Sequence, residues 1–242
     1  MSLTGMGVLS STEIYSNDEV QQHALGAVGC DASGDLYRYA KLQSDVSAGY
    51  LVTSLAREAN HQNVPLGVAA AAEDKSVEVT VGATAVDANE YDEGYICFTD
   101  VSPEGEWYRI LSHDASAAGS EDITIYLARR LITAATTSSE VALVRNPWNA
   151  PAVSQLIAER ACGVTVVDVD YSERPYTWLK TRGVCSVLVD TAGITVGYKA
   201  TISDQVDGAV GLYSDVDAEC VVGQMMQTGT ATEFNAIYLS ID

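Results

Sequence analysis

The sequence predicts a mostly β protein, built from antiparallel sandwich-like or barrel-like units with short helices and an extended N-terminal arm. Apolar residues recur at every second position in "KSVEVTVG" (75–82) and "EDITIYLARRL" (121–131), as in strands with one buried face, and "FNAIYLSI" (234–241) is similarly rich in β-branched and aromatic residues. Turn-forming pairs such as Ser33-Gly34 and Asp207-Gly208 interrupt these runs at short intervals. Helical periodicity is scarce, so short turns between strands favour antiparallel sheets.

The N-terminal residues 1–22 are expected to form an arm, because they are small and polar with few apolar side chains. A free arm is the simpler interpretation, and an arm that docks on a neighbouring subunit is the functional one. The candidate contacts in the arm are its apolar residues Leu3, Met6, Val8 and Leu9.

Two short segments carry a helical pattern. The first is Glu13–Ala24, which overlaps the arm. The second is Ala152–Arg160, where Val153, Leu156 and Ile157 are spaced at i, i+3 and i+4. Both are expected to be short helices.

The stretch "YTWLKTRGVCSVLVD" (176–190) predicts an interrupted strand. Trp178, Lys180 and Arg182 share one parity, and Gly183 then breaks the run. A glycine inside a strand commonly marks a bulge or a close approach of two backbones. We expect the rings to pack and the cations to reach a rim or a neighbouring subunit, which makes these three residues candidate contacts.

The sequence predicts a boundary between domains at "VRNPWNAPAV" (144–153), where two prolines interrupt ladder hydrogen bonding. It separates an expected β domain at 23–146 from a second at 147–242, each within the usual size range. Trp148 lies in this boundary, and we include it among the candidate contacts because exposed aromatic residues often fill interfaces.

Charge dominates the composition: 13 Lys and Arg oppose 33 Asp and Glu, for a formal net charge of −20 over 242 residues. Such a surface repels phosphate backbones and anionic lipid, so we expect no nucleic-acid or membrane partner. The N-terminus shows no signal-peptide pattern and no apolar run approaches the length of a membrane span, so a soluble protein that is not exported is expected.

No pattern of catalytic or metal-binding residues is found. The neighbouring residues Ser112, His113 and Asp114 are adjacent, whereas a catalytic triad is assembled from separated positions. The paired aspartates Asp168 and Asp170 lack a following calcium loop. The five cysteines suit a reducing compartment, and their spacing matches no zinc site; they are Cys30, Cys97, Cys162, Cys185 and Cys220. We expect no enzyme, cofactor or metal.

The segments "YTWLKTRGVCSVLVD", "GITVGYKATIS" and "DGAV" together resemble the C-terminal β unit of structural proteins of tailed bacteriophages. The segment "ALGAVGCDASGDLYRYAKLQSDVSAGYLV" is similar to such proteins too, as are "ANEYDEGYICFTD", "GEWYRI" and "VALVRNP". The resemblance covers residues 24–215 and its glycine-punctuated motifs are loose. The acidic "YSDVDAEC" and the pair Met225-Met226 depart from it.

This resemblance implies a head decoration (cement) protein that lies on the outer capsid surface, bridges capsomers of the major capsid protein and forms a homotrimer assembled in the host cytoplasm. Two other interpretations remain open. One is a tail-tube or baseplate protein, which would form rings or tubes. The other is a β-sandwich carbohydrate-binding module, for which the three tryptophans and thirteen tyrosines could supply stacking surfaces.

Overall fold

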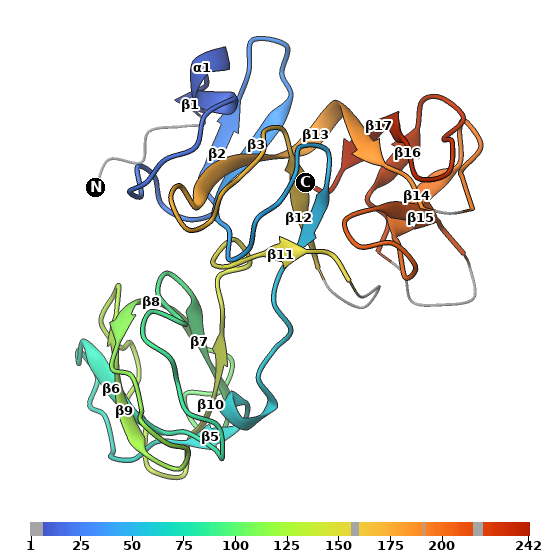
Figure 1. Cartoon of the computed structure of the whole chain (residues 1–242). Coiled ribbons are helices and arrows are strands. Elements are labelled where there is room, and N and C mark those ends of the chain that lie inside the picture. Colours follow the sequence, from blue (N-terminus) through green and yellow to red (C-terminus); the bar gives the residue numbers. More distant parts are fainter. Residues whose placement is uncertain (1–6, 156–159, 191, 215–219) are drawn as a thin grey trace. The chain divides into compact units, whose positions relative to one another are not determined.

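The computed structural model describes residues 7–155, 160–190, 192–214 and 220–242, and strands dominate it (Figure 1). Helical structure in these ranges consists of the single turn α1 (Ser11–Ile14) and the 3-10 turn η1 (Ala59–His61). The expected mostly β fold class is therefore confirmed. No helix of the described ranges has the length and apolar character needed to cross a membrane.

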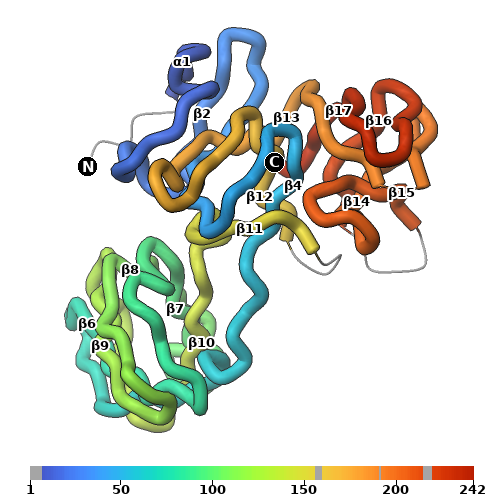
Figure 2. Tube along the Cα trace, viewed as in Figure 1, coloured from blue at the N-terminus to red at the C-terminus, as the bar shows by residue number. Residues whose placement is uncertain are grey.

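The chain divides into two compact units, and one is inserted into the other. Unit 1 consists of residues 1–55 and 150–242, and unit 2 of residues 56–149. Figure 2 shows the chain leave unit 1, build unit 2 and return. This division differs from the expected domains at 23–146 and 147–242: the boundary at 144–153 marks only the return, and residues 23–55 belong with the C-terminal part.

Unit 1 is one branched sheet of eleven strands. The main path runs β1-β2-β3-β13-β17-β16-β14-β15, while β12 pairs with β13 and β4, and β4 pairs with β11. The strands are β1 (Gly7–Val8), β2 (Val28–Cys30), β3 (Leu36–Lys41), β4 (Leu51–Thr53), β11 (Ala152–Val153), β12 (Ala161–Thr165), β13 (Tyr176–Leu188), β14 (Lys199–Ile202), β15 (Val210–Leu212), β16 (Gly223–Met225) and β17 (Phe234–Ser240).

The long strand β13 holds unit 1 together because its two halves have different neighbours. Its first half pairs antiparallel with β3 and with β12. Its second half, from Arg182 to Leu188, pairs antiparallel with β17. The register against β3 shifts between Lys180 and Arg182, and Gly183 has a φ of 104°. The interruption expected at Gly183 is confirmed as an irregularity within one continuous strand.

Two clusters of side chains fill unit 1. Around the second half of β13, apolar residues from both parts of the chain make the core, among them Leu51, Val164, Val187, Ile202 and Ile237. Around the first half, Tyr39 and Trp178 meet with ring centroids 5.1 Å apart, and His23 lies 5.1 Å from the same indole. Aromatic pairs of this kind add to the stability that burial alone provides.

The N-terminal segment contains a shorter helix than expected, and its described part packs against the rest of its own chain. Ser10 and Glu13 form a capping box that starts α1, which ends at Ile14 instead of continuing to Ala24. Residue Asp18 then bridges to Tyr176 in β13. The other expected helix also differs, since Ala152–Val153 is a strand paired with β4; residues 156–159 lie outside the described ranges.

Unit 2 is a six-stranded antiparallel sheet in the order β5-β10-β7-β8-β9-β6. Leu66, just after β5, bridges to Val79 in β6, so the two end strands meet and the sheet is nearly a barrel. Its core lies wholly between Val64 and Leu143. The strands are β5 (Val64–Pro65), β6 (Ser76–Thr80), β7 (Tyr95–Asp100), β8 (Trp107–His113), β9 (Asp122–Leu127) and β10 (Glu140–Val144).

Candidate functional site

Lys180 is buried inside unit 1 instead of reaching a rim. Its Nζ donates hydrogen bonds to Asp35 Oδ2 at 2.5 Å and to the Val184 carbonyl oxygen at 2.6 Å. It also lies 5.5 Å from the centroid of the Tyr37 ring. A buried ammonium is stable only when its charge and its donors are satisfied, and these three partners do so. Lys180 is therefore a structural cation of its own chain.

Gly183 makes this arrangement possible. Its φ of 104° lies in the region that side chains rarely adopt. A Cβ built at this position would overlap the Asp35 carboxylate. The glycine thus gives the carboxylate the space to approach Lys180, which explains why a glycine follows the two cations of this strand.

A groove of about 350 Å³ adjoins the ion pair. It is lined by Tyr15, Ala48, Gly49, Thr165, Val166, Lys180, Val184, Cys185, Ser186 and Phe234. Gly49, with a φ of 82°, allows the Phe234 ring to lie against its backbone, since a Cβ there would come within 2.7 Å of the ring. The groove is thus mostly apolar.

The thiol in the groove is not an activated nucleophile. Burial raises the pKa of Cys185 to about 12; the Lys180 ammonium opposes this rise and the Asp35 carboxylate adds to it. A thiol needs to be deprotonated at neutral pH to attack a substrate. The Cys185 thiol is therefore protonated at neutral pH.

Beside the groove, one face of the sheet carries exposed apolar side chains. We call it the open face and define it as Val184, Met226, Phe234 and Tyr238. Val184 is the direct cross-strand partner of Tyr238, and the exposed fractions of the four range from 42% to 51%. The Met226 amide donates to the Ala236 carbonyl oxygen, which links that residue to the same strand. The face also carries the exposed polar residues Ser186 and Gln224, and exposed apolar side chains grouped in this way mark interaction surfaces.

The residues expected from the sequence to make contacts do not form one surface. Trp178 and Lys180 are buried and Leu9 packs against Gly29, so these three serve their own chain. Val8 is 75% exposed and Arg182 is exposed next to the open face. Trp148 is partly buried in unit 2, and Leu3 and Met6 lie outside the described residues.

The neighbouring residues Ser112, His113 and Asp114 do not act together. His113 Nε2 accepts a hydrogen bond from the Tyr91 amide at 3.0 Å, and its Nδ1 lies 2.9 Å from the Asp114 carbonyl oxygen. Both ring nitrogens thus bond to backbone groups, which fixes the ring as part of the unit 2 fold. Among the described residues, no three His, Cys, Asp or Glu side chains are grouped as metal ligands.

The open face could have been recognised from one signal in the sequence. In "FNAIYLSI", Phe234, Ala236 and Tyr238 alternate with Asn235, Ile237 and Leu239, so the strand is apolar on both faces. A strand that is apolar on both faces is normally covered on both. Here only the face with Ile237 and Leu239 is buried.

Comparison with known proteins gives no relative: no protein-family model, no curated protein and no solved structure matches this chain.

Proposed function

We propose that this chain is a structural component of a tailed-phage virion, a head decoration protein that binds the major capsid protein on the outer capsid surface as a homotrimer. The observation that carries the proposal is the open face, because a sheet with an uncovered apolar side gains stability when a neighbour covers it. The loose resemblance of residues 24–215 to phage structural proteins suggests which neighbour that is.

The free energy gained by burying the open face limits how tightly this face alone can bind a neighbour. Burying a large apolar side chain fully is worth about 1.5–3 kcal/mol, so four that are about half exposed contribute roughly 4 kcal/mol together. Association of two proteins costs an estimated 4–15 kcal/mol in lost freedom. The open face therefore supports a weak contact, and a stable trimer on the capsid needs at least one further contact surface.

The N-terminal arm has a narrower role in this proposal than its length suggests. Leu9 and Ile14 are buried within unit 1, and Ser10 caps α1, so residues 7–18 serve the fold of their own chain. The part of the arm that remains for a neighbouring subunit is residues 1–6 together with the side chain of Val8, which is 75% exposed.

Sedimentation equilibrium of the purified chain tests the proposal. We expect a concentration-dependent trimer for the natural sequence and a monomer for Val184→Asp, because a carboxylate on the open face would lose its hydration on contact. The matched control is Val68→Asp in unit 2, where the valine is similarly exposed at 50% against 46% for Val184. A natural chain that stays monomeric at all concentrations would overturn the trimer.

Binding to particles is the second measurement. Capsids assembled from the major capsid protein encoded with this chain should bind the natural protein, with occupancy visible by cryo-electron microscopy, and should not bind Val184→Asp. Rings or tubes in place of trimers would favour a tail-tube or baseplate protein. Binding to a glycan array without binding to capsids would favour a carbohydrate-binding module.

A further inference from the structure

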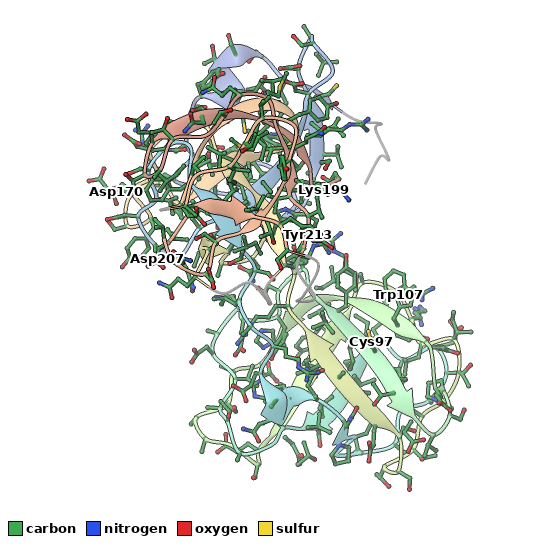
Figure 3. All side chains as sticks on the ribbon, turned by 90° about the vertical axis from the view of Figure 1, so that its right-hand side faces the viewer. Cys97, Trp107, Asp170, Lys199, Asp207 and Tyr213 are labelled. Carbon is green, nitrogen blue, oxygen red and sulfur yellow. The ribbon has the colours of Figure 1, made fainter. Side chains whose placement is uncertain are left out.

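A second exposed patch lies on unit 2, away from the residues that fill its core. We call it the Trp107 patch and define it as Tyr95, Trp107, Arg109 and Arg129. Trp107 is 54% exposed on β8 (Figure 3), and its ring centroid is 5.5 Å from that of Tyr95 on β7. Arg109 is the cross-strand partner of Tyr95. Tryptophan, tyrosine and arginine are the residues that dominate binding energy at protein interfaces.

Arg129 is held in place before any partner arrives. Its guanidinium carbon lies 4.6 Å from the Tyr108 ring centroid and 5.7 Å from that of Trp107. Its Nη2 donates to the Trp107 carbonyl oxygen at 2.7 Å. The Tyr108 ring beneath is itself fixed, since its hydroxyl bonds Glu106 and accepts the Ile132 amide at 2.9 Å. A fixed side chain loses little entropy on binding, which increases affinity.

The charge of the patch restricts its partner. Arg109 forms an ion pair with Glu93 at 2.6 Å, whereas Arg129 makes no ion pair with any described residue. The Glu106 carboxylate, whose pKa is lowered by hydrogen bonds from Thr133 and Tyr108 and further by the Arg129 charge, is near Arg129 but forms no ion pair with it. The patch suits a partner that presents an aromatic ring together with carboxylates.

Unit 1 presents such a surface. A hollow of about 520 Å³, which we call the Tyr171 hollow, is lined by Glu19, Tyr171, Ser172, Glu173, Arg174 and Pro175. Tyr171 is 48% exposed, and Glu19, Glu173 and Arg174 are also exposed, so two carboxylates and one guanidinium face this hollow. The volume falls within the range that accommodates drug-sized ligands, and an indole with an adjoining guanidinium is of that size.

The turn that carries the hollow is rigid. Asp170, labelled in Figure 3, accepts hydrogen bonds from both the amide and the hydroxyl of Ser172, at 3.0 and 2.7 Å. The Tyr171 amide donates to Asp45 Oδ1 at 3.1 Å, and Val169 bridges to Val46. These bonds fix the turn on the body of unit 1, so the hollow does not need to be ordered on binding.

We infer that the Trp107 patch of one copy of this chain binds in the Tyr171 hollow of a second copy, with Trp107 against Tyr171 and Pro175 and with Arg129 facing Glu173. The contact joins two different surfaces, so it repeats from copy to copy and closes a ring if the rotation allows. It also places a cation opposite two carboxylates of the neighbour, which offsets part of the repulsion between copies that each carry a net charge of −20. The inference rests on the proposed self-association and supplies the further contact that the open face requires.

Charge reversal tests the pairing by sedimentation equilibrium. We expect Arg129→Glu and Glu173→Arg each to raise the dissociation constant about tenfold or more, since each creates a like-charge contact. The double variant R129E/E173R restores opposite charges in every contact and should return to within about threefold of the natural value. The matched control is Arg130→Glu, which makes the same charge change at the next residue, 4.0 Å from Glu73.

The possible results separate this inference from the proposed function. If the natural chain associates and Val184→Asp abolishes association, but neither single reversal changes it, the self-association stands and this pairing is overturned. If the single reversals weaken association and the double variant does not restore it, Arg129 binds another surface and the pairing is again overturned. A natural chain that never associates overturns the proposed trimer together with the pairing.

Discussion

At the scale of residues, the buried ion pair of Lys180 and Asp35 depends on Gly183, which has no side chain and so forms no bond of its own with either charged group. Gly183 leaves the space that the Asp35 carboxylate occupies, and it also adopts a φ of 104°. Any side chain at this position would therefore destabilise the folded state in two ways, by straining the backbone and by displacing the carboxylate. Displacing Asp35 would leave the Lys180 ammonium buried with one partner fewer, which is expensive in a protein interior.

We therefore expect Gly183→Ala to lower the free energy of unfolding by about 3–4 kcal/mol. The control is Gly34→Ala, because Gly34 has a φ of 87° but no atom within 4 Å of a built Cβ. That variant carries only the backbone strain and should lose about 1–2 kcal/mol. Urea denaturation followed by circular dichroism measures both. Equal losses in the two variants would show that the carboxylate can move aside at no cost.

The sequence predicted the strand and the interruption at these residues but not the fate of the cations. Alternation alone places Trp178, Lys180 and Arg182 on one face, and nothing local tells which of them is covered. Lys180 turns out to be buried because its partner Asp35 comes from a segment 145 residues earlier in the chain. Arg182, two residues later, stays exposed. The spacing of residues within one strand cannot predict such a pair between distant segments of the chain.

At the scale of elements, the N-terminal segment illustrates how tertiary contacts limit a local pattern. Ser10 and Glu13 form a capping box, and α1 begins at Ser11, two residues before the expected start at Glu13. The helix then ends after one turn, because the chain is drawn to β13 by the bridge from Asp18 to Tyr176. The apolar spacing within 13–24 predicted a helix, but an isolated helix of that length is marginal without packing.

The contacts of the N-terminal segment predict how its truncation changes the stability of the protein. Removal of residues 2–6 should change the free energy of unfolding by less than about 0.5 kcal/mol, since it leaves the buried Leu9 and Ile14 and the cap of α1 in place. Removal of residues 2–12 should cost about 2–3 kcal/mol, because Leu9 loses its burial and α1 its cap. Leu9→Ala in the full chain should reproduce most of that loss.

These truncations also sharpen the test of particle binding. A deletion of 2–12 that releases the protein from capsids could act through the fold of unit 1, whereas a deletion of 2–6 leaves Leu9 and the cap of α1 in place. If both truncated proteins melt at the same temperature, Leu9 does not contribute the stability that its burial implies.

At the scale of the whole molecule, the order of the strands in space was the part least accessible from the sequence. Individual strands at 75–82, 121–131, 176–190 and 234–241 were predicted where the structure has them. The pairing of β3 with β13 was not, and it is this pairing that joins residues 23–55 to the C-terminal part. A domain boundary read from two prolines marks a turn in the chain but does not reveal which earlier segment returns to pair.

The chain passes between the two units twice, at residues 55–56 and 149–150. The geometry at these two connections predicts that the units fold independently. In unit 1, β4 and β11 are antiparallel, with Thr53 opposite Ala152. Joining Leu55 directly to Ala150 would therefore connect these strands through a short loop, of the length found in ordinary β-hairpins. In unit 2, Arg145 Nη1 donates to the Ala56 carbonyl oxygen at 2.6 Å, so the two ends of that unit meet as well.

We expect a chain of residues 1–55 joined to 150–242, and a separate chain of residues 56–149, each to unfold in a single cooperative urea transition with a β-type circular dichroism spectrum. The matched control cuts at the proline boundary: residues 147–242 alone should not fold cooperatively, because β13 would lose β3 and β12 would lose β4. Edge groups left unpaired in that fragment favour aggregation. If residues 147–242 fold alone while the joined chain does not, the β3–β13 pairing is not what stabilises unit 1.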